Sequence, residues 1–131
     1  MKIKAIESNE APQAIGPYSQ AIKANDFLFV SGQLPIDPET GKFVEGDMRD
    51  LTNRVLDNIE AILKEAGLKW DHVVRAEIFL KNLAQDFAAV NEEYAKRFQG
   101  DAPPARQTVQ VADLPLGSPI EISCIAVTSE P

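Results

Sequence analysis

Two short runs of β-prone residues begin the patterned part of the chain, at residues 20–24 and 27–31. The pair between them, Asn25-Asp26, tolerates the positive φ of a tight turn, so the pattern predicts an antiparallel hairpin. A second turn signal follows at residues 37–41, an Asp-Pro-Glu-Thr-Gly segment. We expect the chain to reverse there in a loop or small hairpin.

Apolar residues then recur at three- and four-residue steps, as on one face of a helix. Asp47 precedes this stretch and is a good N-cap, while Gly67 follows it and favours a helix end. The pattern predicts one long amphipathic helix between these two residues. Its apolar face contains Met48, Leu51, Val55, Ile59, Ile62 and Ala66.

Residues 73–80 change to an alternating pattern, which indicates a strand with one strongly apolar face. The residues predicted on that face are Val74, Ala76, Ile78 and Leu80. A strand of this kind fits a central or next-to-central place in a sheet.

Helical spacing returns after this strand, with Asn82 as the expected cap and an end near Gly100. An aromatic-rich stripe is predicted to face the core and consists of Phe87, Val90, Tyr94 and Phe98. The side predicted to face water carries Glu92, Glu93, Lys96 and Arg97.

Two further strands are predicted at residues 107–111 and 120–128, joined by a loop whose prolines and glycine exclude a helix. The order of the elements predicts an α+β domain, a mixed β-sheet with two helices packed on one face. The opposite face also carries apolar residues. These apolar residues predict that this face associates with another chain, because an exposed apolar sheet face would otherwise promote aggregation.

The length and composition fit a single domain spanning residues 1–131. Apolar and charged fractions of 44% and 25% are ordinary for a soluble globular protein, and no apolar run approaches the roughly 18 residues of a membrane span. Residues 1–6 alternate like a strand and lack the apolar block of a signal peptide. We therefore expect a cytoplasmic protein without a membrane partner.

Charge and residue types exclude several kinds of chemistry. The net charge is −7 and the 13 basic residues are scattered, so no nucleic-acid partner is expected. Cys124 is the single cysteine and lies in an apolar run, which excludes a disulfide within the chain and indicates a buried hydrophobe. His72 is the single histidine, and its place in a loop favours a structural role.

A cation and a carboxylate occur in the last two predicted strands. Arg106 and Thr108 share one strand face, and Glu121 would lie opposite them if the two strands pair. That arrangement would place a fixed cation beside a carboxylate. The alternative is a simple salt bridge or two solvated charges, since exposed ion pairs are common and contribute only roughly 0 to 1 kcal/mol.

Three separated motifs add information that spacing does not. They are Ile15-Gly16-Pro17-Tyr18-Ser19-Gln20, Ser31-Gly32-Gln33-Leu34-Pro35, and Pro103-Pro104-Ala105-Arg106-Gln107-Thr108-Val109 followed by Ile120-Glu121-Ile122. In order and spacing they resemble the signatures of the Rid family, the reactive intermediate deaminases, and in particular its RidA subgroup. The resemblance implies a chorismate-mutase-like (YjgF-like) fold, assembled as a homotrimer with a central β-barrel and with sites in clefts between adjacent subunits.

The resemblance also implies an activity, that of a 2-iminobutanoate/2-iminopropanoate deaminase. Such an enzyme hydrolyses enamine and imine intermediates, including 2-aminoacrylate, to 2-keto acids and ammonia, with no metal or other cofactor. Arg106 would bind the substrate carboxylate, Glu121 would hold and activate water, and Tyr18 would supply a hydrogen bond or a proton relay. The cleft would also be lined by Ser31, Gly32, Asn91 and Thr108.

Other functions remain open beside this one. Noncatalytic binding or sensing of a keto acid would use the same arginine-lined cleft. Chorismate mutase activity is suggested by fold analogy alone and would call for several convergent cations. Ribonuclease activity would call for a basic stripe or a histidine pair, which the sequence lacks. Thr108 stands where several relatives carry cysteine, so thiol-dependent activity is not transferred.

Overall fold

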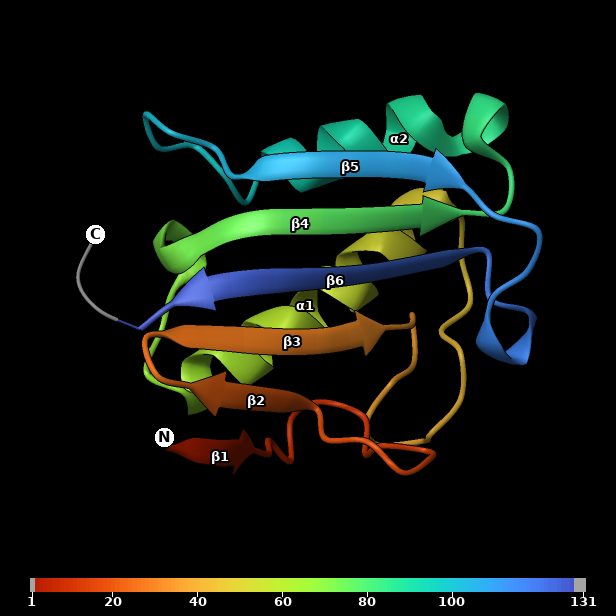
Figure 1. The fold of residues 1–131 in the computed structure, drawn as a ribbon. Coiled ribbons are helices and arrows are strands. Elements are labelled where there is room, and N and C mark those ends of the chain that lie inside the picture. Colours follow the sequence, from red (N-terminus) through yellow and green to blue (C-terminus); the bar gives the residue numbers. More distant parts are fainter. Residues whose placement is uncertain (1, 129–131) are drawn as a thin grey trace.

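A six-stranded sheet covered on one face by two helices makes up the computed structural model, which describes residues 2–128 (Figure 1). The elements in chain order are β1 (Ile3–Ile6), β2 (Ala21–Ala24), β3 (Phe27–Gln33), α1 (Met48–Glu65), β4 (Val73–Leu80), α2 (Leu83–Ala95), β5 (Ala105–Gln110) and β6 (Ile120–Val127). Two short 3₁₀ turns lie at Trp70–His72 and Pro115–Gly117. This architecture confirms the predicted α+β fold.

The strand order is β1-β2-β3-β6-β4-β5, and only the β4–β5 pair is parallel. The predicted hairpin is confirmed in β2 and β3, where Asn25 adopts a positive φ of 53°. The reversal after β3 is also confirmed, since Ile36 bridges Phe43 across a turn in which Gly41 has a φ of 73°. β4 is next to the centre of the sheet, as its apolar composition predicted.

Helix α1 begins and ends where its caps predicted. The Asp47 side chain accepts a hydrogen bond from the Asp50 backbone N–H at 3.0 Å, and the Asp50 side chain accepts one from Asp47 at 3.1 Å. Gly67 follows the helix with a φ of 76°. Between them, the buried stripe of α1 packs on the sheet and contains Val55, Leu56, Ile59, Ile62 and Leu63.

The alternation of buried and exposed residues in β4 is interrupted near its start, which corrects the prediction for Val74. Val73 is 4% exposed and Val74 is 40% exposed, the reverse of the expected order. The register of β4 on β6 shifts between Val73 and Arg75, as at a β-bulge. An extra residue at a bulge turns the side chains before it to the other face, while Ala76, Ile78 and Leu80 stay buried.

Helix α2 is shorter than its pattern predicted, and two of its residues differ from the prediction in exposure. Asn82 caps it by accepting a hydrogen bond from Gln85 N–H at 3.2 Å, but it ends at Ala95, before Gly100. Phe87 was predicted in the core and is 40% exposed. Glu93 was predicted to face water and is 5% exposed, because the helix packs beside α1.

Strand β4 lies between β5 and β6, so the two C-terminal strands are not neighbours. In the register of the sheet, Arg106 is level with Ala76 and shares its helix-covered face, whereas Glu121 pairs with Phe79 on the opposite face. The expectation that Glu121 sits opposite Arg106 is therefore wrong within one chain. The physical reason is the connection through α2, which makes β5 a parallel neighbour of β4.

Apolar side chains remain exposed on the helix-free face of the sheet. Phe27 and Phe29 of β3 are each 45% exposed and pair with Val127 and Ile125 of β6, which are only partly buried. This face is therefore not covered by any described part of the same chain. Neither helix within residues 2–128 has the length and apolar character that crossing a bilayer requires.

Candidate active site

A pocket of about 310 Å³ opens where the start of β6 meets the end of β3. It is lined by Ile15, Tyr18, Ser31, Gly32, Leu34, Pro115 and Glu121. The first two motifs and the glutamate of the third thus converge in the fold, although the first two motifs (residues 15–35) lie 86 to 106 residues before Glu121 in the chain. We call this hollow the Glu121 pocket.

Glu121 is partly buried in this pocket, and its burial raises the pKa of the carboxyl group. Among residues 2–128, no side chain or backbone amide donates a hydrogen bond to its carboxylate. A Cβ on Gly32 would lie 2.6 Å from Glu121 Cδ and 2.8 Å from Oε2. The sequence placed Gly32 in the lining of the cleft, and the structure shows that its missing side chain makes room for the glutamate.

Tyr18 stands at the mouth of the Glu121 pocket and is 46% exposed. Its hydroxyl oxygen accepts a hydrogen bond from Ile15 N–H at 3.3 Å, and the Tyr18 N–H donates to Gly16 O at 2.8 Å. The Ser31 hydroxyl donates to Ser19 O at 2.6 Å. Ser31 thus fastens the loop that carries Tyr18, so its hydroxyl has a partner before any ligand arrives.

Gln20, the last residue of the first motif, supports the same loop, although the sequence predicted no role for it. It is 3% exposed, and its side-chain amide donates to Pro12 O at 2.8 Å and to Ser8 O at 3.1 Å, while its oxygen accepts from Ser8 N–H at 2.6 Å. A buried amide that meets its hydrogen bonds in this way fixes the loop ahead of Tyr18. The sequence signal that could have indicated this supporting role is the position of Gln20 directly before strand β2.

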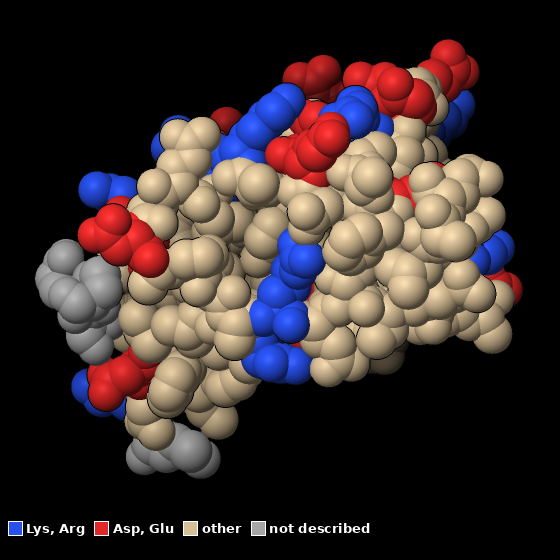
Figure 2. All heavy atoms as spheres, turned by 90° about the horizontal axis from the view of Figure 1, so that it is seen from above, with Lys and Arg blue, Asp and Glu red and all other residues tan. Residues whose placement is uncertain are grey.

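Arg106 lies on the other face of the sheet, at the edge strand β5 beside α2. Its Nη1 donates to Asn91 Oδ1 at 2.7 Å, and its guanidinium carbon is 5.0 Å from the centre of the Tyr94 ring. Thr108 follows on the same strand face, and its hydroxyl is buried without a hydrogen-bond partner among residues 2–128. Figure 2 views the molecule from this edge and shows a line of basic side chains crossing a broad surface of uncharged residues.

One chain therefore holds two separate groups of the residues singled out from the sequence. Tyr18, Ser31, Gly32 and Glu121 form one group on the Glu121 pocket. Asn91, Arg106 and Thr108 form the other, on β5 and α2. A single chain does not place the arginine beside the glutamate.

The lone cysteine and histidine are structural. Cys124 is 4% exposed and its burial raises the thiol pKa to about 12, so a thiolate does not form near neutral pH. His72 is 8% exposed, and its Nδ1 accepts a hydrogen bond from Lys69 N–H at 3.1 Å. Within the described range, His, Cys, Asp and Glu side chains do not gather in threes as a metal site would need.

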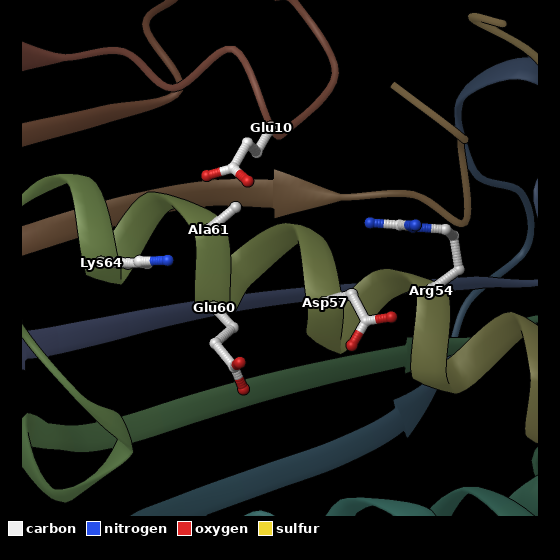
Figure 3. A pocket seen from close by; sticks show the side chains of 6 residues that line it. All are labelled: Glu10, Arg54, Asp57, Glu60, Ala61 and Lys64. Atoms are coloured by element: carbon white, nitrogen blue, oxygen red, sulfur yellow. The ribbon is translucent and has the colours of Figure 1, made fainter. Parts of the chain in front are cut away.

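A second hollow, of about 270 Å³, lies on the far surface of α1 and carries charges of both signs. Figure 3 shows Glu10 on the loop after β1 lying over Ala61 of the helix, with Arg54 and Lys64 further along it and Asp57 and Glu60 pointing away from Glu10. Arg97 already pairs with Asp57 at 2.8 Å and with Glu60 at 3.2 Å. These acids are solvated surface partners, so we do not assign them a ligand.

The family model described as endoribonuclease L-PSP matches residues 8–128. The chain belongs to this family, which includes the Rid proteins. Protein DfrA of Myxococcus xanthus is 53% identical over 130 residues, which is 98% of each chain. The chloroplastic Reactive Intermediate Deaminase A of Arabidopsis thaliana is 52% identical over 96% of this chain and 66% of that protein.

Solved structures agree with this assignment. The Rid family protein YyfA of Yersinia pestis superposes with a TM-score of 0.92, at 47% identity over 96% of this chain and 99% of its own. Escherichia coli TdcF, solved with bound serine, superposes with a TM-score of 0.90, at 40% identity over 96% and 99% of the two chains. The Rid resemblance of the three motifs is thus confirmed at the level of the family and the fold.

Proposed function

We propose that this Rid protein is a deaminase that hydrolyses reactive imines and enamines, including 2-iminopropanoate and 2-iminobutanoate, to 2-keto acids and ammonia. The observation that carries the proposal is the Glu121 carboxyl, which is held against Gly32 in a pocket and has no donor among the described residues. A carboxylate in that state is free to take a hydrogen bond from water. The deaminase from Arabidopsis thaliana supports the same activity.

The complete site would need two copies of the chain. Glu121 and Arg106 lie on opposite faces of one sheet, so a substrate that touches both must bind between subunits. The exposed Phe27 and Phe29 on the helix-free face provide apolar surface for such an assembly. The proposed assembly is the homotrimer with a central barrel that the family resemblance implies.

Arg106 would bind the substrate carboxylate with its planar guanidinium. One Nη1 hydrogen is taken by Asn91, and the residue is exposed, so donors remain for two carboxylate oxygens. None of the acidic side chains within residues 2–128 forms a salt bridge with Arg106. The arginine therefore keeps its charge for an anionic ligand.

Glu121 would orient the attacking water at the partner half of the site. Water adds to the C=N carbon of the N-protonated imine while one of its protons passes to the Glu121 carboxylate, which yields a neutral carbinolamine. The amine then takes this proton from Glu121 and leaves as ammonia, while the carbinol O–H gives its proton to the carboxylate and the carbonyl forms. The Tyr18 hydroxyl, at the mouth of the same pocket, would hydrogen-bond to the reacting group or pass the proton.

A noncatalytic carboxylate binder is the second candidate, and the serine bound to TdcF favours it. A coupled assay separates the two functions. A threonine or serine dehydratase supplies the imine, and the appearance of keto acid and ammonia is timed with and without this protein. Acceleration supports the deaminase, whereas no acceleration together with tight keto-acid binding supports the binder.

Two substitutions test the assigned roles in that assay. Arg106→Lys should raise KM, because an ammonium lacks the bidentate fork. Glu121→Ala should lower kcat while the oligomeric state, measured by analytical ultracentrifugation, stays that of the parent. Unchanged turnover in both variants would refute the mechanism.

A further inference from the structure

One stripe of helix α2 faces the Arg106 guanidinium. Phe87, Asn91 and Tyr94 follow one another at steps of four and three residues, so they share one helix face. The guanidinium carbon is 5.9 Å from the centre of the Phe87 ring and 5.0 Å from that of Tyr94, and Nη1 donates to Asn91 at 2.7 Å. The stripe therefore contacts the cation with two aromatic rings and one amide oxygen.

We propose that Phe87 and Tyr94 are positioning residues, which hold the Arg106 guanidinium by cation–π contact in the orientation that a substrate carboxylate needs. The inference rests on the proposed function, because it deepens the role of Arg106 there. It also changes the role of Asn91, which becomes a partner of the arginine before any ligand binds. The ligand class is a small 2-imino or 2-keto acid.

Every group that holds Arg106 is neutral. Two other arginines of the described chain are held by acids, Arg49 by Glu92 and Glu93, and Arg97 by Asp57 and Glu60. Arg54 is held by the neutral Asn58 side chain. A carboxylate beside Arg106 would fix it equally well but would compete with the substrate for its charge. Aromatic rings and an amide fix the side chain and leave that charge to the ligand.

The ring of Tyr94, and not its hydroxyl, provides the contact. Tyr94 is 6% exposed, and its hydroxyl has no hydrogen-bond partner among residues 2–128. Burial raises the pKa of Tyr94 to about 12, so the phenol stays neutral and does not form an ion pair with the arginine. Tyr94→Phe should therefore leave ligand binding unchanged, since it keeps the ring and removes only the unpartnered hydroxyl.

Phe87 offers the more direct test, because it is 40% exposed and its replacement leaves the core intact. Phe87→Leu keeps the apolar bulk but removes the aromatic ring, whereas Phe87→Tyr retains the ring. Trp70→Leu is the matched control, because it removes a different ring–arginine contact, that of Trp70 with Arg97 at 5.8 Å, and Trp70 is separated from Tyr94 by the Phe98 ring. Circular dichroism and ultracentrifugation establish that each variant is folded and assembled as the parent.

The expected result is a split between KM and kcat in the dehydratase-coupled assay. Phe87→Leu should raise KM by about threefold to tenfold, as expected for one partly desolvated cation–π contact, with kcat within about twofold. Its Kd for pyruvate, measured by calorimetry, should rise by the same factor. Phe87→Tyr and Trp70→Leu should match the parent. An unaltered KM and Kd in Phe87→Leu, or equal losses in Phe87→Tyr, would overturn the inference.

A third measurement judges the positioning separately from the proposed function. The heteronuclear NOE of the Arg106 Nε–H group should report a rigid guanidinium in the parent and a mobile one in Phe87→Leu. If the parent neither hydrolyses imines nor binds pyruvate, the proposed function fails while this comparison still decides the inference. Equal rigidity in parent and variant would refute the positioning role.

Discussion

Replacing Gly32 by alanine should displace the Glu121 carboxyl group without unfolding the chain. The new Cβ would lie 2.6, 2.8 and 2.9 Å from Glu121 Cδ, Oε2 and Cγ. Ordinary contact begins at 3.4 Å, so Cδ must move by at least about 0.8 Å. All three crowded atoms belong to one flexible side chain. It can rotate away at a cost of about 1 kcal/mol or less in the free energy of unfolding.

The catalytic cost should be much larger than the cost in stability. A misplacement of about 1 Å at a reacting centre can lower a rate by roughly 100-fold. We therefore expect Gly32→Ala to reduce kcat by roughly 10- to 100-fold in the dehydratase-coupled assay. KM should change little, because Arg106 lies elsewhere in the fold.

Gly100→Ala is the matched control, since a Cβ there meets no atom within 4 Å. The double variant Gly32→Ala/Glu121→Ala should be no slower than Glu121→Ala, because the glycine acts only through the glutamate. Urea unfolding of each variant checks the stability. Parent-like kcat in Gly32→Ala, or a further loss in the double variant, would refute this reasoning.

Three predictions concern titrating groups. Hydrogen bonds from Asn53, Arg49 and Lys96 lower the pKa of Glu93 to about 2, so the stability they add is present above pH 4.5 and is lost as the pH falls towards 2. Glu93→Gln should lose less stability over that window in urea unfolding, and an identical pH profile would contradict the assignment. Because burial raises the Cys124 pKa to about 12, mass spectrometry should find no alkylation of the native thiol by iodoacetamide at pH 8 and full alkylation in urea; rapid native labelling would show that the site opens. Because burial also raises the Glu121 pKa, the acid limb of the kcat/KM profile should have its midpoint above 4.5, and this limb should vanish in Glu121→Gln; its persistence would assign the limb to another group.

Local signals were sufficient for most of the secondary structure. The cap at Asp47 and the stop at Gly67 bound α1 within two residues, because both act on backbone groups a few positions away. The hairpin at Asn25 is equally local, since its turn joins adjacent strands. The motifs likewise contain most of the residues that line the Glu121 pocket.

Long-range packing decided the features that the patterns misplaced. The exposure of Val74 follows from a bulge that only the β6 partner defines, and the burial of Glu93 follows from the docking of α2 beside α1. Periodicity averages over a helix face and does not report which neighbour will cover it. The aromatic contact of Phe87 with Arg106 is hidden in the same way, since a stripe on one helix does not name its partner.

Local patterns in the amino-acid sequence specify the elements, the α+β class and the residue types available for a carboxylate-binding site. The order of the strands comes from packing: β4 separates β5 from β6, so that Arg106 and Glu121 face opposite sides of the sheet. Capping, turns and periodicity arise between residues close in the chain. Strand order arises from contacts between residues far apart, whose energies no short window of sequence contains.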